Sequence, residues 1–170
     1  MRVIEDLQAR GLVYQSTDER LDDVLAAGPT TVYCGFDPSD SSLHVGSLVP
    51  ILGLVRFQRA GHRPIALLGG GTGMIGDPSG KENERPLLSP DDLAHNLAGI
   101  REQLGRFIDV SDCAGLVLNN ADWLAGHSLI AFLRDTGKHF SVSAMLAKES
   151  VLARLATGIS FTEFSYMLLQ

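Results

Sequence analysis

One stretch of this sequence combines residue types that could bind and stabilise an anionic ligand. The run Leu43-His44-Val45-Gly46-Ser47 follows Asp37-Pro38 and is predicted to open a helix. In the first turn of a helix the dipole favours a neutral imidazole over a protonated one, and a neutral imidazole can donate a hydrogen bond to an anion. Gly46 would leave room for a flat ring or a ribose against the helix backbone. The alternative is a surface histidine near a helix start.

The glycine-rich stretch further along the chain is the second candidate for ligand chemistry. Gly71-Thr72-Gly73-Met74-Ile75-Gly76 matches G-x-G-x-x-G, but the helix-hostile Asp77-Pro78-Ser79-Gly80 follows it, and the next predicted strand ends in asparagines where a dinucleotide fold has an acid. The segment from Gly76 to Lys81 resembles a P-loop that is one residue short, and Glu82 stands where Ser or Thr should hold magnesium. Both motif readings are rejected. The glycines then either let the backbone approach a small ligand or form a flexible loop.

Two cations lie just beyond these glycines. Lys81 and Arg85 alternate with Glu82 and Glu84. Alternating charge in a polar loop is typical of a solvated surface. Beside a nucleotide site, the same two cations would suit a mobile clamp on pyrophosphate.

The elements that must position these residues are predicted from hydrophobic periodicity and turn residues. A helix from about residue 43 would be capped by Ser41-Ser42 and bent at Pro50. The tetrad Ser160-Phe161-Thr162-Glu163 has the capping-box pattern and predicts a helix that continues to the last residue given. Strands are expected at 31–36, 64–68 and 115–118, and helices at 4–10, 20–27, 43–60, 89–107, 128–136, 143–156 and from 160 onward.

The order strand, helix, strand, helix, strand predicts a parallel sheet with right-handed crossovers. In such sheets, ligands bind beyond the carboxyl ends of the strands, where helix N-termini also point. The pattern therefore predicts a nucleotide-type site in the loops 37–46, 69–77 and 119–123.

Composition narrows the function classes. The net charge of −6 gives no support for strong non-specific binding to nucleic acid. Cys34 and Cys113 are the only cysteines and form no CxxC pair, so a disulfide framework or a protein-bound metal is not expected and a reducing compartment is the simpler interpretation. No apolar run reaches the length of a membrane span.

Four segments, in this order, resemble the bacterial tyrosyl-tRNA synthetases, a family of class I aminoacyl-tRNA synthetases. They are YCGFDPSxxSLHVG from Tyr33, FQRAGHRPIALLGGGTGMIGDPSGKENER from Phe57, FLRDTGKHFSV from Phe132 and ISFTEFSYMLLQ from Ile159. The resemblance covers essentially the whole chain. The tryptophan enzymes are the nearest relatives, but they lack the tyrosine-bearing strand and the GDPSGK-type loop in this form.

The resemblance implies an α/β fold: a Rossmann-like parallel sheet with flanking helices, the first half of a class I nucleotide-binding fold, after short N-terminal helices. Residues 1–170 would form a single incomplete catalytic domain, with N-terminal helices in 1–30, the nucleotide- and tyrosine-binding part in 31–123, and a helical dimer and substrate segment in 124–170. The KMSKS signature is absent from these residues. The chain is therefore expected to carry part of an active site and to be inactive alone.

The implied activity is that of a tyrosine–tRNA ligase, which activates tyrosine with ATP and transfers it to tRNA(Tyr). The tyrosine carboxylate is already a competent nucleophile, so the enzyme needs positioning and positive charge rather than a general base. The expected partners are tyrosine, ATP with Mg²⁺ bound through its phosphates, tRNA(Tyr) and a second copy of the chain. The expected location is the cytoplasm, with no membrane association.

The resemblance also assigns site residues. His44 and Ser47 fall on the HIGH signature, where Ser47 replaces the second histidine and offers a hydroxyl of shorter reach. The catalytic set is His44, Ser47, Lys81 and Arg85. The ATP set is Cys34, Gly35, Asp37, Ser39, His44, Gly46 and Ser47. The tyrosine set is Tyr33 at the phenol, Thr72, Asp77, Tyr166 and Gln170 around the ammonium group, and Asn120 and Trp123 on the pocket wall.

The last predicted helix bears on assembly. Its apolar residues Phe161, Phe164, Met167 and Leu168 could form one stripe facing the core, with Tyr166 and Gln170 on the opposite face toward the substrate. The resemblance places Phe161 at a two-fold dimer interface, and the alternative is an ordinary core phenylalanine.

Two other functions remain open at this point. One is a truncated, non-catalytic synthetase copy that binds a nucleotide or dimerises. The other is a different nucleotidyl transferase of the same fold.

Overall fold

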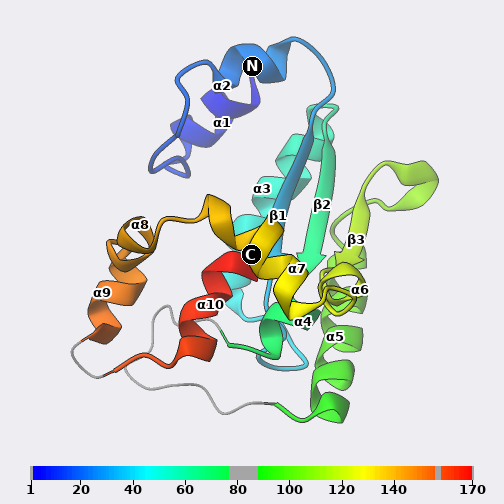
Figure 1. Ribbon diagram of the computed structural model, residues 1–170. Coiled ribbons are helices and arrows are strands. Elements are labelled where there is room, and N and C mark those ends of the chain that lie inside the picture. The colour runs from blue at the N-terminus through cyan, green and yellow to red at the C-terminus, as the bar shows by residue number, and fades with distance from the viewer. Residues whose placement is uncertain (1, 77–87, 156–157, 170) are drawn as a thin grey trace. The chain divides into compact units, whose positions relative to one another are not determined.

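One parallel sheet links the segments that carry the candidate site. In the computed structural model, which describes residues 2–76, 88–155 and 158–169, its strands are Thr31–Phe36 (β1), Arg63–Leu68 (β2) and Leu116–Asn119 (β3) (Figure 1). Their order within the sheet is β1-β2-β3, with α3 (Leu48–Arg59) between the first two along the chain and α5 (Pro90–Gly105) between the last two. The predicted α/β class and the alternation of strand and helix are confirmed.

Burial along these elements follows their periodicity. In β2, Pro64, Ala66 and Leu68 are buried, while the residues between them are only half-buried, as a period of two requires. In α5, Leu93, Ile100 and Leu104 are buried at a spacing typical of one helix face. Sequence periodicity therefore locates the strands and the long helix within one or two residues.

The helix after β1 begins later than predicted. His44 is extended, with φ −94° and ψ 170°, and precedes a short 3₁₀ helix, Val45–Ser47 (η1), that leads into α3. The predicted start at residue 43 and the cap by Ser41-Ser42 are wrong. Because α3 starts at Leu48, Pro50 falls in its first turn, where its missing N–H is least costly.

Other differences concern short helices. The stretch expected as a glycine-rich loop contains α4 (Gly70–Gly73), and the helix expected at 143–156 is two helices, α8 and α9. The remaining elements are α1 (Val3–Ala9), α2 (Leu21–Ala26), η2 (Ser111–Cys113), α6 (Ala121–Leu124), α7 (Leu129–Asp135), η3 (Gly137–His139), α8 (Val142–Leu146), α9 (Glu149–Leu155) and α10 (Phe161–Leu169).

The described chain divides into two compact units. The first comprises Met1–Phe36, Ser42–Leu67 and Gly99–Leu118, and the second comprises Asp37–Ser41, Leu68–Ala98 and Asn119–Gln170. Each unit is built from segments distant in sequence. The Asp37–Ser41 segment, directly after β1, packs in the second unit.

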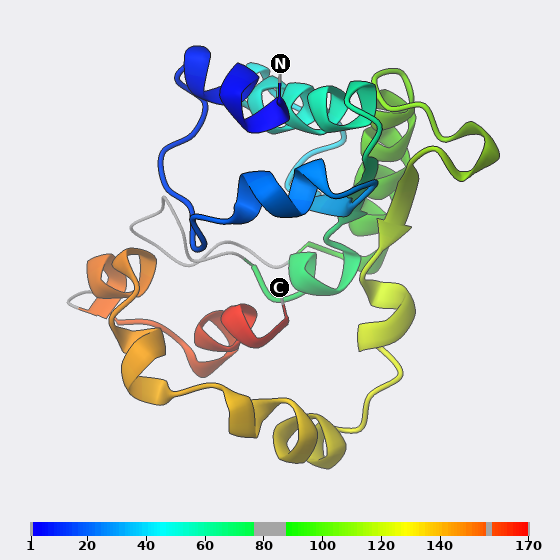
Figure 2. The ribbon, with the colours of Figure 1, turned by 90° about the horizontal axis from the view of Figure 1, so that it is seen from above.

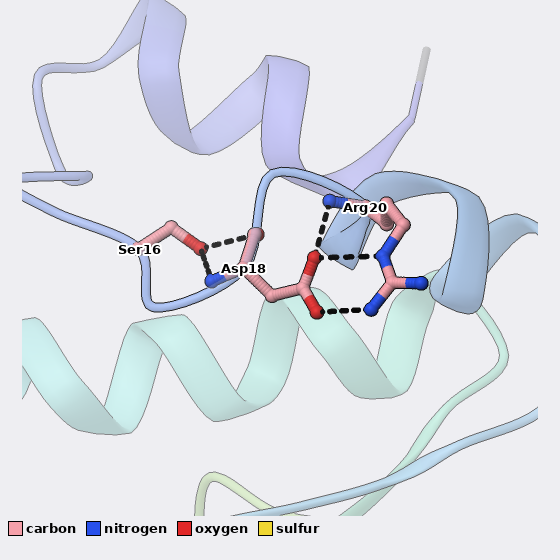
Figure 3. A network of polar contacts seen from close by, with 3 residues as sticks. All are labelled: Ser16, Asp18 and Arg20. Atoms are coloured by element: carbon pink, nitrogen blue, oxygen red, sulfur yellow. Dashed lines mark hydrogen bonds and ion pairs between the residues drawn. The ribbon is translucent and has the colours of Figure 1, made fainter.

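In the first unit, the N-terminal helices are tied to the sheet region. α1 lies beside α3 (Figure 2), and Asp6 of α1 forms an ion pair with Arg56 of α3. Val3, Leu7 and Leu25 form a small apolar cluster. Figure 3 shows how α2 begins: the Asp18 carboxylate accepts hydrogen bonds from the Arg20 backbone N–H at 2.8 Å and from its guanidinium at 2.9 and 3.1 Å. That hydrogen bonding lowers the pKa of Asp18 below its usual value.

In the second unit, α4 makes contacts with both α6 and α10. These three helices bring the ends of β2 and β3 together with the C-terminal part of the described chain. None of the helices described here combines the length and the apolar character needed to cross a membrane.

Candidate functional site

A carboxylate at the end of β1 is the meeting point of the candidate site. Oδ1 of Asp37 accepts a hydrogen bond from Thr72 Oγ1 at 2.9 Å, and Oδ2 accepts one from the Tyr166 hydroxyl at 2.7 Å. Thr72 belongs to α4 and Tyr166 to α10. One half-buried side chain thus joins segments 129 residues apart in sequence.

Asn120, just after β3, extends this arrangement. Its Nδ2 donates to Thr72 Oγ1 at 3.2 Å, and its Oδ1 accepts from the Gly71 N–H at 2.7 Å. We call Asp37, Thr72, Asn120 and Tyr166 the Asp37 network. Thr72, Asn120 and Tyr166 are only 2%, 3% and 5% exposed, so their hydrogen bonds replace those that water would make.

Glycine is required at two positions beside this network, because neighbouring side chains lie too close to the backbone there to leave room for a Cβ. A Cβ on Gly69 would lie 2.0 Å from Asp37 Oδ1 and 2.5 Å from Thr72 Oγ1. A Cβ on Gly70 would lie 2.1 Å from Oδ1 of Asn119, which accepts the Gly70 N–H. The backbone of Gly69 and Gly70 therefore lies against the protein's own polar side chains. Residues 77–81, on which the P-loop comparison depends, lie outside the described residues.

The chemistry of the network follows from its donors and acceptors. An ionised carboxylate only accepts hydrogen bonds. Two hydroxyl donors also fix the carboxylate in orientation. The network can therefore present a fixed negative charge to a ligand group that donates, such as an ammonium group or a sugar hydroxyl.

The other ATP-set residues near β1 lie in the first unit. Cys34 and Gly35 are in β1, and the Cys34 thiol donates to the Gly35 carbonyl at 3.7 Å. Partial burial raises the pKa of the Cys34 thiol above its usual value, which disfavours the thiolate. Tyr33, also in β1, is 66% exposed.

His44 and Gly46 are brought together directly. A Cβ on Gly46 would lie 2.9 Å from Cε1 and 3.0 Å from Nδ1 of the His44 ring. The imidazole of His44 therefore lies against the Gly46 backbone. The His44 carbonyl accepts the Ser47 N–H at 2.9 Å and starts η1.

The remaining predicted residues divide into three groups. Ser39 follows the network aspartate, and its N–H donates to the Asp37 carbonyl at 2.9 Å. Trp123 lies in α6 with a half-exposed side chain. Asp77, Lys81, Arg85 and Gln170 lie outside the described residues.

The orientation of α10 differs from the prediction. Its buried side chains are Glu163 and Tyr166, three apart, while Phe161 at its start is 76% exposed. The alternative of a core position for Phe161 is therefore wrong, while Tyr166 of the same helix is buried and donates to Asp37. The helix itself begins as predicted, with the Glu163 N–H donating to Ser160 Oγ at 3.1 Å.

Two asparagines that support the site were not assigned a role from the sequence, although Asn119 falls within the predicted site loop 119–123. Asn119 Oδ1 accepts the N–H groups of Gly70 and Ala121, both at 3.1 Å, and so caps α4 and α6 together. Asn96 interrupts the apolar stripe of α5 and donates to the Pro38 carbonyl at 3.0 Å. A polar residue at a core position of a helix is a usable signal, since a buried amide needs a partner.

No group of three or more His, Cys, Asp or Glu side chains in the described parts of the chain is arranged to hold a metal ion.

Comparisons with known proteins agree on one family. Residues 25–170 match the family described as tRNA synthetases class I (W and Y). The tyrosine–tRNA ligase of Opitutus terrae is 59% identical over 100% of this chain, and that of Roseiflexus castenholzii is 58% identical over 99%. The chain spans 41% and 40% of the length of these two relatives.

The solved structures agree with the sequence comparison. A C-terminally truncated mitochondrial tyrosyl-tRNA synthetase from Aspergillus nidulans superposes with a TM-score of 0.85 at 28% identity. The match covers 99% of this chain and 51% of that one.

Replacing Gly69 by alanine tests whether its backbone lies directly against the side chains of the Asp37 network. The new methyl group would meet the Asp37 carboxylate and the Thr72 hydroxyl, so we expect Gly69→Ala to lower the free energy of unfolding by about 1–3 kcal/mol, as overpacking does. Gly53→Ala, in α3 with open space around it, is the matched control, and we expect it to be neutral or stabilising by up to about 1 kcal/mol. Urea denaturation followed by circular dichroism measures both. Equal stability of the two variants would contradict this packing.

Proposed function

This chain belongs to the class I tRNA synthetases for tryptophan and tyrosine, and from that premise we propose that it is part of a tyrosine–tRNA ligase. The choice of tyrosine is supported by the names of the relatives, which are 52–59% identical to this chain. The chain covers about two fifths of their length, so the activity is proposed for the complete protein that contains it.

The Asp37 network is the observation that carries the proposal on the structural side. A tyrosine substrate brings an ammonium group and ATP brings ribose hydroxyls, and both can donate to a fixed carboxylate. We expected Asp37 in the ATP set and Thr72 and Tyr166 in the tyrosine set, and these three are hydrogen-bonded to one another. The network would therefore lie where the two substrates meet.

The proposed reaction needs no proton transfer in its first step. A carboxylate oxygen of tyrosine attacks the α-phosphorus of ATP, the bond to the β-phosphate oxygen breaks, and tyrosyl-adenylate and pyrophosphate form. His44 and Ser47 would donate hydrogen bonds to phosphate oxygens, and Lys81 and Arg85 would stabilise the charge on the leaving pyrophosphate. Tyr33 would contact the tyrosine phenol, and Asp77, Gln170, Asn120 and Trp123 would surround the rest of the amino acid.

The same proposal includes the metal ion, the second reaction step and the location of the protein. Mg²⁺ would be held largely by the phosphates of ATP, as is usual for this ion. In a second step, tRNA(Tyr) would receive the tyrosyl group through its terminal ribose. A cytoplasmic location is expected because ATP, tyrosine and tRNA meet there.

Tyrosine-dependent exchange of pyrophosphate into ATP tests the function. We expect the complete protein to catalyse exchange with tyrosine and not with tryptophan. His44→Ala should lower the rate about 10²–10³-fold while leaving tyrosine binding nearly unchanged, as the loss of one transition-state donor does. The matched control is His95→Ala, at an exposed position of α5, and it should exchange at the wild-type rate. Exchange with tryptophan, or none with either amino acid, would refute the proposal.

We also propose that the complete protein is a homodimer with Phe161 in the contact. The support is a large apolar side chain that is 76% exposed in the single chain, at the start of a capped helix. In a two-fold interface the same patch meets itself, so one substitution acts twice.

Phe161→Asp should give a folded monomer at neutral pH, because it places two carboxylates in an apolar contact. Val24→Asp, at another exposed apolar position in α2, is the control and should remain dimeric. Sedimentation velocity measures assembly, and circular dichroism confirms folding. A Phe161→Asp protein that remains dimeric would exclude this residue from the interface.

A further inference from the structure

We propose that Asn96 and Gln103, two amide side chains of α5, position the segment 38–43 that leads to His44, and thereby set the affinity for ATP. The part that concerns ATP rests on the proposed function. These residues would act through the segment they hold, so they are positioning residues.

Asn96 holds the first end of the segment. Its side chain is 8% exposed, and its Nδ2 donates to the Pro38 carbonyl at 3.0 Å. Pro38 is itself fully buried. A Cβ on Gly73 would lie 3.1 Å from Cγ of Pro38 and 3.1 Å from Cδ1 of Leu93, so α4 and α5 both pack closely around this position. The peptide between Pro38 and Ser39 is therefore fixed by packing and by one directed hydrogen bond.

Gln103 holds the other end. Its Oε1 accepts the Leu43 backbone N–H at 3.0 Å in a partly buried setting. The next residue is His44, whose extended backbone starts η1. The orientation of the Leu43 peptide thus sets the direction in which the chain enters the histidine.

The spacing of the two amides makes the arrangement specific. Asn96 and Gln103 are seven residues apart in α5, which is two helical turns, so they project from nearly the same face. One donates to a carbonyl and the other accepts from an N–H, so a chain segment beside the helix is held through both kinds of backbone group. Each contact lies within one compact unit: Asn96 with Pro38 in the second and Gln103 with Leu43 in the first.

An apolar side chain could not replace either amide in this role. The buried Pro38 carbonyl needs a donor, and the Leu43 N–H needs an acceptor. The segment carries Ser39 and is flanked by Asp37 and His44, all three assigned to ATP. Small displacements of such groups reduce reaction rates strongly. Loss of either amide should therefore lower kcat/KM for ATP more than it weakens the binding of tyrosine.

Four variants of the complete protein test the inference. Asn96→Ala removes the donor, and Gln103→Met removes the acceptor at similar side-chain length. Gln103→Glu retains an acceptor oxygen and serves as the conservative rescue, and His95→Ala is the matched control on the same helix. For each, amide hydrogen exchange reports on residues 38–44, and pyrophosphate exchange gives KM and kcat for both substrates.

We expect faster hydrogen exchange at residues 38–44 in Asn96→Ala and Gln103→Met, with kcat/KM for ATP lowered about tenfold and the tyrosine dissociation constant within about twofold of wild type. Gln103→Glu and His95→Ala should behave like wild type. The inference would be overturned if hydrogen exchange at residues 38–44 did not change. It would also be overturned if the use of ATP and the binding of tyrosine were impaired to the same extent. A wild-type protein that lacks tyrosine-dependent exchange would instead overturn the proposed function, and hydrogen exchange would still decide whether the amides hold the segment.

Discussion

The carboxylate of Asp37 is the interaction on which the rest of the site depends. A half-buried negative charge is costly unless donors surround it, and Thr72 and Tyr166 supply hydroxyl donors to its two oxygens. To do so, α4 must bring Thr72, and α10 must bring Tyr166, within hydrogen-bonding distance of Asp37. Gly69 has no side chain because the same carboxylate lies against its backbone. One charge thus constrains the composition of one loop and the orientation of one helix.

The asparagines at the end of β3 show how weak local preferences are overcome. Glycine is a poor helix former, yet Gly70–Gly73 is helical. Asn119 and Asn120 accept the N–H groups of Gly70 and Gly71, which a short helix would otherwise leave unsatisfied. Since Asn120 also donates to Thr72, the capping of α4 and the support of Asp37 are a single arrangement.

Much of this fold is predictable from the sequence, and the reasons for the exceptions are physical. β1 has the predicted bounds, because Thr31–Phe36 is a β-branched and aromatic run that Asp37-Pro38 ends. Asp37, Thr72, Asn120 and Tyr166 could each be named as site residues through a family resemblance. Their mutual hydrogen bonds could not, since they join segments far apart in sequence. Hydrophobic periodicity alone leaves a core position open for Phe161, and its exposure in the structure goes against that alternative.

If Thr72 and Tyr166 act through the same carboxylate, a double-mutant cycle shows it most directly. Thr72→Val and Tyr166→Phe each remove one hydroxyl with little change of shape. The dissociation constant of tyrosine is measured for wild type, both single variants and the double variant. If both hydroxyls act on the Asp37 carboxylate, the losses of tyrosine-binding free energy in the two single variants will not add up to the loss in the double variant. The difference, the coupling free energy, should be about 0.5–3 kcal/mol. Losses that add, with no coupling, would mean that the two hydroxyls act independently and would contradict the account.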